Sequence, residues 1–153
     1  MRTIIRRRLT LWNAAAHGDQ PHAATIIYRR DNPFAVEIIL PLHDPDTVTN
    51  DRLCVHPGNR DDEIAVLIPF SRALLIDGME EPAGEGDVRV EPHIVDSGYI
   101  ALTLPLTREG TEFYTERGPL EAFADETLRM LPLGDEIPIA DAALDRWLDG
   151  VFA

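Results

Sequence analysis

Few side chains in this sequence could act as a catalytic nucleophile. The chain contains one cysteine, Cys54, and two serines, Ser71 and Ser97. Ser97 stands in an Asp-Ser-Gly tripeptide that superficially resembles a protease nucleophile, but the alternating apolar segments on both sides are typical of a hairpin turn. Cys54 lies two residues from His56, and a thiol beside an imidazole can form a nucleophile. Because no further signature surrounds this pair, the sequence favours a cysteine in a variable loop.

The segment 41–63 gathers the side chains that could bind a metal ion. It contains His43, His56 and six acidic residues. Their spacing matches neither the EF-hand loop nor the His-Glu-x-x-His pattern. We therefore expect a solvated acidic loop over residues 41–63, and we expect no metal and no other cofactor.

Residues 82–87, Pro-Ala-Gly-Glu-Gly-Asp, begin like a glycine-rich phosphate-binding loop. A dinucleotide-binding fingerprint would have its third glycine where Arg89 stands, and a phosphate loop would be followed by a lysine and a helix. Since none of these follows, we predict a turn that leads into a strand. A small hydrolase that works through the 41–63 loop is therefore the least favoured class of function.

The length and composition fit one globular domain. The chain has 153 residues, of which 44% are hydrophobic, and this is enough apolar material for a sizeable core. Its longest apolar runs have the length of strands and are too short to cross a bilayer. A single cysteine cannot form an internal disulfide, which is typical of a reducing compartment. We expect a single cytoplasmic domain over residues 1–153.

The net charge is strongly negative, at −13, and all 14 basic residues are arginines. Four arginines lie within the first eight residues, so the rest of the chain carries −17. Such a body repels phosphate backbones and anionic membrane surfaces. We therefore expect no nucleic-acid binding and no membrane insertion. A single-stranded nucleic-acid-binding protein stays open as the alternative, because paired strands could place Arg6, Arg7 and Arg8 beside Arg29 and Arg30.

Alternating apolar residues predict an antiparallel sheet. Val36, Ile38 and Leu40 recur at every second position, and the same period of two returns along much of the chain. The predicted strands are 3–12, 24–30, 35–40, 64–70, 88–93, 99–104 and 111–115. Residues 13–23 are expected to connect the first two strands, and Asn32-Pro33 to close a hairpin between the second and the third.

The predicted helices follow the strands. Ser71 can cap a short helix that runs to Ile76 and ends at Gly78. Residues 119–152 are expected to form a helical C-terminal part, with one helix from Pro119 and a final helix capped by Asp141. Strands followed by helices predict an α+β fold with a mainly antiparallel sheet.

Three stretches in a fixed order resemble a known family. They are residues 28–36, Tyr-Arg-Arg-Asp-Asn-Pro-Phe-Ala-Val, residues 66–78, Val-Leu-Ile-Pro-Phe-Ser-Arg-Ala-Leu-Leu-Ile-Asp-Gly, and residues 82–92, Pro-Ala-Gly-Glu-Gly-Asp-Val-Arg-Val-Glu-Pro. In this order and spacing they are similar to the SsgA-like proteins, an actinomycete sporulation and cell-division family. The resemblance covers about residues 24–152.

The resemblance implies a fold, a function and partners. The implied fold consists of packed antiparallel β-sheets with short helices and C-terminal helices, similar to Whirly and mitochondrial guide-RNA-binding proteins, assembled as a homotrimer or larger ring. Members of the family are small cytoplasmic non-enzymes that guide septum placement during sporulation-linked division, so a location at division septa is expected. The implied partners are the tubulin-like division GTPase or another SsgA-like protein.

The resemblance also implies a partner-binding surface on turns of the sheet. The residues that match the family motifs there are Asn32, Pro33, Phe34, Arg72, Gly86, Asp87 and Arg89. A structural role stays open for each of them. Asn32 and Pro33 could only fix a tight turn, and Arg72 could pair with a nearby carboxylate. Asp87 and Arg89 could form an ion pair on one face of a strand.

Overall fold

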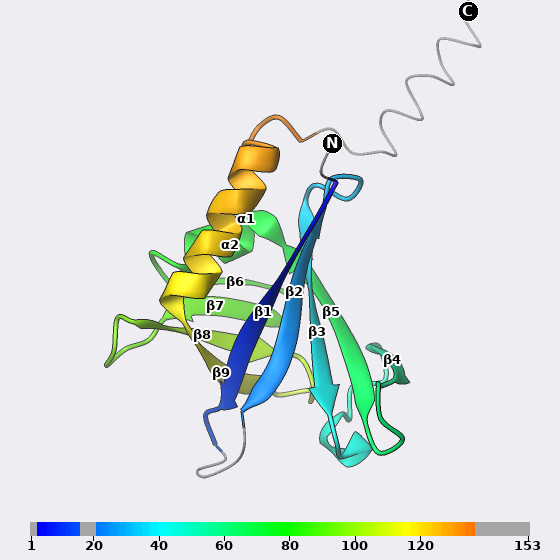
Figure 1. Cartoon of the computed structure of the whole chain (residues 1–153). Helices are drawn as coiled ribbons and strands as arrows, with labels where there is room; N and C mark the ends of the chain where they lie inside the picture. Colours follow the sequence, from blue (N-terminus) through cyan, green and yellow to red (C-terminus); the bar gives the residue numbers. More distant parts are fainter. Residues whose placement is uncertain (1–2, 16–20, 137–153) are drawn as a thin grey trace, which may run out of the picture.

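The computed structural model describes residues 3–15 and 21–136, which contain nine strands and two α-helices (Figure 1). The strands are β1 (Ile4–Asn13), β2 (His22–Arg29), β3 (Ala35–Leu42), β4 (Cys54–Pro57), β5 (Ile64–Ser71), β6 (Ala83–Glu85), β7 (Val88–Pro92), β8 (Tyr99–Leu104) and β9 (Thr111–Glu116). The helices are α1 (Arg72–Gly78) and α2 (Arg117–Met130), and a short 3-10 helix covers Pro45–Thr47.

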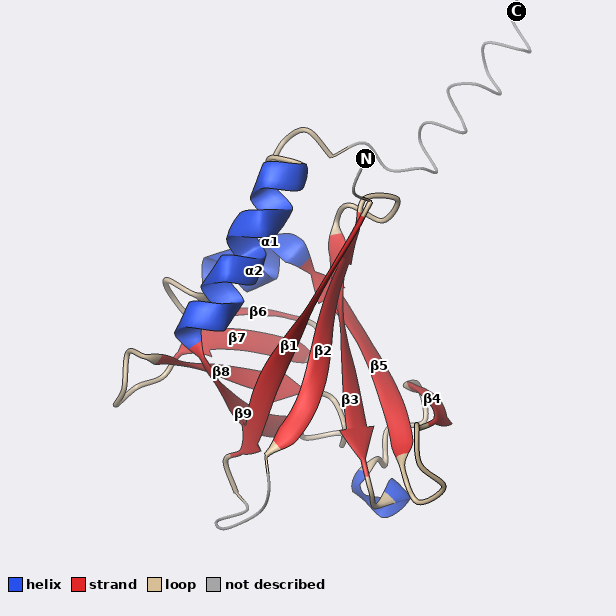
Figure 2. Cartoon of the chain, in the orientation of Figure 1, coloured by secondary structure: helices blue, strands red, loops and turns tan. Residues whose placement is uncertain are grey.

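All nine strands belong to one antiparallel sheet with the order β4-β5-β3-β2-β1-β9-β8-β7-β6. Strands β1–β5 run at a steep angle to β6–β9, so the sheet curls and its two halves face each other (Figure 2). The halves are joined where Trp12 and Asn13 of β1 pair with β9. The predicted α+β fold with a mainly antiparallel sheet is confirmed. The resemblance implied separate packed sheets, whereas the structure has one sheet whose two halves pack against each other.

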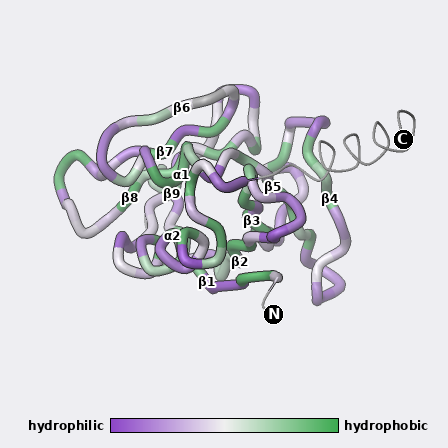
Figure 3. Tube along the Cα trace, turned by 90° about the horizontal axis from the view of Figure 1, so that it is seen from above, coloured by the Kyte–Doolittle hydropathy of each residue, from purple (hydrophilic) through white to green (hydrophobic). Residues whose placement is uncertain are grey.

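The core lies between the two halves of the sheet. On β3, Val36, Ile38, Leu40 and Leu42 are buried, and the residues between them lie half-buried on the outer face. Buried hydrophobic residues from both halves and from both helices form one cluster. Hydrophobic and hydrophilic residues alternate along the trace in Figure 3. The period of two therefore accounts for which face of β3 is buried.

Helix α1 begins and ends as the sequence predicts. Ser71 is its N-cap, and the Ser71 hydroxyl accepts a hydrogen bond of 3.2 Å from the Leu74 backbone N–H. The C-terminal end of α1 packs closely on β7, since a Cβ atom added at Gly78 would lie 2.4 Å from the Cβ of Val90. Gly78 is therefore required by a close approach between the helix and the sheet.

Helix α2 packs against β1 and β9. It begins at Arg117, two residues before the predicted start at Pro119. Pro119 is tolerated at the third helical position, because the N–H groups of a first helical turn have no intrahelical acceptor. The buried face of α2 consists of Leu120, Phe123, Ala124 and Thr127. The predicted final helix capped by Asp141 lies outside the described residues, and none of the described helices is long and apolar enough to cross a membrane.

The expectation of a loop throughout residues 41–63 is wrong. Residues Cys54–Pro57 form β4, which pairs with β5 through the register Cys54↔Leu67 to Pro57↔Ile64. All four side chains of β4 are exposed, so no buried alternation reveals this strand in the sequence. The three-residue strand β6 was missed for a similar reason, because it is too short to show a period.

Candidate binding surfaces

The turn between β2 and β3 presents one large apolar side chain to solvent. Asn32 is exposed, Pro33 is buried, and Phe34 is 50% exposed. The turn is fixed from inside, because the buried Tyr28 hydroxyl donates a 3.1 Å hydrogen bond to the Pro33 carbonyl oxygen. Pro33 therefore has a structural role, whereas Asn32 and Phe34 lie where a partner can reach them.

Arg72 lies inside the molecule, although it was expected on a contact surface. Its side chain is 1% exposed and forms an ion pair with Glu136. Its guanidinium also donates hydrogen bonds of 3.1 Å to the Thr127 carbonyl and 2.6 Å to the Leu131 carbonyl, at the C-terminal end of α2. The expected surface position of Arg72 is wrong. The structure instead has the alternative, in which Arg72 pairs with a carboxylate, that of Glu136.

The buried guanidinium changes the acid–base properties of its neighbours. Its hydrogen bond holds the pKa of Glu136 below the ordinary value, against the opposing effect of burial. Burial raises the pKa of Tyr28, and the charge of Arg72 offsets this only in part. The Arg72 Cζ atom lies 4.8 Å from the centre of the Tyr28 ring, which suits a cation–π contact. Within the described residues, Arg72 Nε is buried without a hydrogen-bond partner.

The segment 83–92 is a hairpin, as the predicted turn into a strand requires. Glu85 pairs with Val88, so Gly86 and Asp87 form a two-residue loop. Gly86 has φ of 63°, a conformation that glycine adopts without strain and that type II′ hairpin turns need at this position. Asp87 and Arg89 are both exposed. The ion partner of Arg89 is Glu91, at 3.4 Å, and not Asp87 as the sequence suggested.

The structure brings only some of the predicted residues together. The Arg72 backbone N–H donates a 2.8 Å hydrogen bond to the Phe34 carbonyl, so the 32–34 turn adjoins the junction of β5 and α1. Asp87 lines a hollow of about 400 Å³ with Ser71 at the same junction. Arg89 lines a second hollow with Thr103 of β8, and Asp87 lines this hollow too. Phe34 and Asp87 thus lie near one junction, and Asp87 also lies beside Arg89 at the second hollow.

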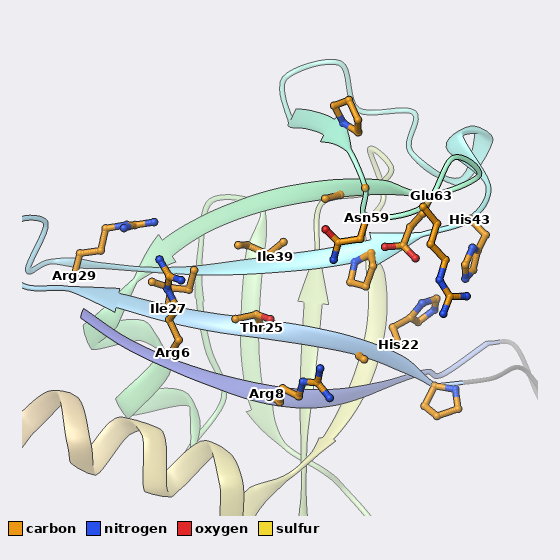
Figure 4. Close-up of a pocket in the computed structure, with 17 residues that line it drawn as sticks. Arg6, Arg8, His22, Thr25, Ile27, Arg29, Ile39, His43, Asn59 and Glu63 are labelled. Atoms are coloured by element: carbon orange, nitrogen blue, oxygen red, sulfur yellow. The ribbon is translucent and has the colours of Figure 1, made fainter. Parts of the chain in front are cut away.

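A large hollow lies on the outer face of β1–β5 and was not predicted as a site. It is an open groove of about 850 Å³ (Figure 4). We call it the arginine groove, because its lining includes Arg6 and Arg8 of β1, Arg29 of β2 and Arg60 of the β4–β5 connection. Its apolar floor consists of Ile27, Ile39, Pro41 and Ala65.

One observation in the sequence pointed toward the arginine groove. The pairing of β1 with β2 places Arg6 opposite Ile27 and Arg8 opposite Thr25, on the outer face that also carries Arg29. The open alternative placed Arg6, Arg7 and Arg8 beside Arg29 and Arg30; of these, Arg6, Arg8 and Arg29 line the groove. Arg7 points to the other face of the sheet, where it pairs with Glu126 of α2.

The residues suspected of chemistry lie on a hairpin turn and on the exposed strand β4. Asp96 accepts a 2.9 Å hydrogen bond from the Gly98 N–H, so the tripeptide around Ser97 is the predicted hairpin turn. Cys54 is an exposed free cysteine on β4. Within residues 3–15 and 21–136, no group of three or more histidine, cysteine or acidic side chains is arranged to hold a metal ion.

The family described as "Streptomyces sporulation and cell division protein, SsgA" matches residues 23–136. The chain belongs to this family. The matched range includes all seven predicted contact residues, but it begins after β1, which carries Arg6 and Arg8. The resemblance that rested on residues 28–36, 66–78 and 82–92 is therefore confirmed.

Named relatives in the SsgA family extend over most of the chain. The sporulation-specific cell division protein SsgB of Frankia casuarinae is 34% identical over 124 residues, which cover 79% of this chain and 73% of the relative. The SsgB of Salinispora tropica is 31% identical over 133 residues, which cover 85% of this chain and 82% of the relative. These proteins share the sequence pattern of this chain along most of their own length.

Solved structures show the same fold. An SsgA-like sporulation-specific cell division protein from Thermobifida fusca matches with a TM-score of 0.69 and 24% identity, covering 94% of this chain and 95% of that one. A structure from a study of SsgB mutations and longitudinal cell division during sporulation of Streptomyces coelicolor matches with a TM-score of 0.66 and 24% identity, covering 88% and 94%. The curled sheet is thus the fold of other proteins in the SsgA family.

Proposed function

We propose that this protein acts without catalysis in sporulation-linked cell division, where it guides septum placement by binding division proteins. The observation that carries the proposal is the SsgA family match over residues 23–136, which include β3–β9 and both described helices. The relatives named above are sporulation-specific cell division proteins. The proposal includes a cytoplasmic location with enrichment at division septa.

The proposed contact surface is the junction between the 32–34 turn and the 86–87 turn. Phe34 is half-exposed on a turn that two internal hydrogen bonds hold in place, to Tyr28 and to the Arg72 backbone. An aromatic side chain fixed in this way can enter a partner's pocket with little loss of conformational entropy. The proposed partner is the tubulin-like division GTPase or another SsgA-like protein.

Replacement of Phe34 tests the proposed surface. Phe34→Ala should abolish septal localisation of a tagged copy and pull-down of the division GTPase, while the melting temperature is unchanged. Val55→Ala is the matched control, because Val55 is also an exposed apolar residue, at 46%, and lies on β4. If Phe34→Ala localises and binds like the unchanged protein, the contact surface lies elsewhere.

A homotrimer is part of the proposal. The observation that supports it is the SsgA family match over residues 23–136. Light scattering at micromolar concentration measures the mass directly. A mass near that of one chain would contradict the proposed assembly.

A single-stranded nucleic-acid-binding protein of Whirly-like fold is the second candidate. It is favoured by the alignment of Arg6, Arg8 and Arg29 on one face. Base stacking needs aromatic platforms, and the described residues that line the arginine groove include no tryptophan, tyrosine or phenylalanine. We therefore predict no appreciable affinity at physiological salt. Tight filter binding of single-stranded DNA or RNA with a steep salt dependence, lost on replacement of the groove arginines by alanine, would favour this candidate instead.

A further inference from the structure

We infer that the arginine groove is a second docking surface, which binds an extended, acidic segment of a protein partner whose apolar side chains alternate with carboxylates. The groove lies on the outer face of β1–β5 (Figure 4), and its lining includes none of residues 32–34. The inference goes beyond the proposed function, because it concerns another surface and another kind of contact.

The charge of the groove is opposite to that of the chain. Four arginines and one carboxylate, Glu63, are among its lining residues, whereas the whole chain carries −13. Arg29 forms an ion pair with Glu37, with 3.2 Å between Arg29 Nε and Glu37 Oε1. The side chains of Arg6, Arg8 and Arg60 form no ion pair with any residue in the described part of the chain. Unpaired guanidinium groups at the edge of an apolar floor are suited to bidentate contact with carboxylates.

The spacing of the arginines fits an extended peptide. Arg6 and Arg8 stand on the same face of β1, two residues apart, which corresponds to about 7 Å. Alternate side chains of an extended segment are separated by the same distance, so two of its carboxylates can contact both arginines. The lining follows β2 from His22 to Arg29, a length of roughly 23 Å that about seven extended residues would span.

The floor of the groove accounts for apolar side chains in the ligand. Ile27 is 3% exposed, because its outer-face neighbours cover it, and Ile39, Pro41 and Ala65 extend this apolar strip toward β5. Three spacings between β1, β2, β3 and β5 make the groove roughly 14 Å wide. Arg60 belongs to the connection between β4 and β5, so the arginines of the groove come from β1, from β2 and from this connection. The described lining has no tryptophan, tyrosine or phenylalanine for base stacking, whereas a peptide with alternating carboxylates and apolar side chains matches both the arginines and the apolar strip.

The test is direct binding of a synthetic segment to the full-length protein. The probe is a fluorescein-labelled peptide of about ten residues with alternating aspartate and leucine, long enough for the groove. Peptides of the same length with serine or lysine in place of aspartate, and an oligothymidylate, are the comparison ligands. We expect fluorescence anisotropy to show binding of the aspartate peptide alone, weakened as salt is raised to about 0.5 M.

Charge reversal of the groove arginines decides whether the peptide binds there. Arg6→Glu with Arg8→Glu should weaken binding about fivefold for each arginine, and Arg60→Glu should weaken it about as much. Arg129→Glu on α2 is the matched control, since Arg129 is exposed outside the groove, and it should leave binding unchanged. Arg6→Gln with Arg8→Gln gives a second pair that adds no negative charge, and the melting temperature of every variant confirms folding.

Three results would overturn the inference. The first is equal affinity of the aspartate peptide for the unchanged protein and for the two double variants of Arg6 and Arg8, which we call the groove pairs. The second is tighter, groove-dependent binding of the oligothymidylate than of the peptide, which would make the groove a nucleic-acid site. The third is an absence of peptide binding while the groove pairs change the mass in light scattering, which would make the groove an interface between copies. Phe34→Ala should retain peptide binding, so failure of the proposed function does not affect this experiment.

Discussion

Replacement of Arg72 by methionine should destabilise the protein strongly, because the Arg72 side chain joins three distant parts of the fold. The guanidinium, which is 1% exposed, donates to the carbonyl oxygens of Thr127 and Leu131 and to the carboxylate of Glu136. It also lies over the ring of Tyr28. Methionine retains an apolar stem of similar length but provides no charge and no hydrogen-bond donor.

The expected loss follows from which groups lose their partners. The Thr127 carbonyl keeps a 2.9 Å hydrogen bond from the Leu131 N–H, so the Leu131 carbonyl and the Glu136 carboxylate are affected most. Removal of one member of a buried ion pair destabilises a protein by about 3–5 kcal/mol. For a domain of this size, each kcal/mol lowers the melting temperature by about 2–4 °C. Arg72→Met should therefore lower the melting temperature by roughly 6–20 °C.

Thermal unfolding followed by circular dichroism measures this change, and Arg89→Met is the matched control. The Arg89 side chain is 55% exposed and forms only a 3.4 Å pair with Glu91, a contact worth less than about 1 kcal/mol. We expect the two melting temperatures to differ clearly. An unchanged melting temperature for Arg72→Met, together with loss of partner binding, would refute the structural role and return Arg72 to the contact surface.

Three further predictions concern the same core. Gly78→Ala should lower the free energy of unfolding by about 1–3 kcal/mol, measured with denaturant, because the new Cβ would overlap Val90. The pKa of Glu136 is lowered in the folded state, so the unfolded chain binds the proton more readily. The free energy of unfolding should therefore fall as the pH drops below the ordinary pKa of 4.5. Glu136→Gln should reduce this loss of stability at acid pH. The pKa of Tyr28 is raised, so stability should fall as the pH rises above 10.0, and Tyr28→Phe should reduce that loss in an alkaline titration of the melting temperature.

The elements that the sequence predicts well are those whose signals are local. The period of two placed β3 and β5 within two residues of their observed ends, because both strands have one buried face. The Ser71 cap was also predicted correctly, since its hydrogen bond reaches only three residues along the chain. The predicted turn at Asp96-Ser97-Gly98 depends on a contact over two residues. Each of these features needs no knowledge of distant parts of the chain.

The features that sequence reasoning missed depend on contacts over long separations or on exposed edges. The partners of Arg72 lie 55 to 64 residues away, at the end of α2 and beyond it, so its burial has no local signature. Strand β4 is an exposed edge strand held by backbone pairing to β5, and its side chains follow no apolar pattern. The arginine groove also needs the strand order, because its lining extends from β1 to the connection after β4.

The buried Arg72 side chain and the exposed Phe34 side chain are parts of one arrangement. The Arg72 backbone N–H donates a 2.8 Å hydrogen bond to the Phe34 carbonyl. The Arg72 guanidinium lies over the ring of Tyr28, and the Tyr28 hydroxyl donates a 3.1 Å hydrogen bond to the Pro33 carbonyl. Arg72 is therefore a positioning residue for the turn from which Phe34 projects, and it can be required for binding without contacting a partner.

The two roles separate experimentally, because Arg72→Met should lose binding together with thermal stability, whereas Phe34→Ala should lose binding alone. Arg72→Lys should recover part of the stability, since the ammonium keeps the charge beside Glu136 but lacks the fork that reaches both carbonyls and the carboxylate. If binding recovers in proportion to the melting temperature in this series, the contribution of Arg72 to binding is the support of the turn.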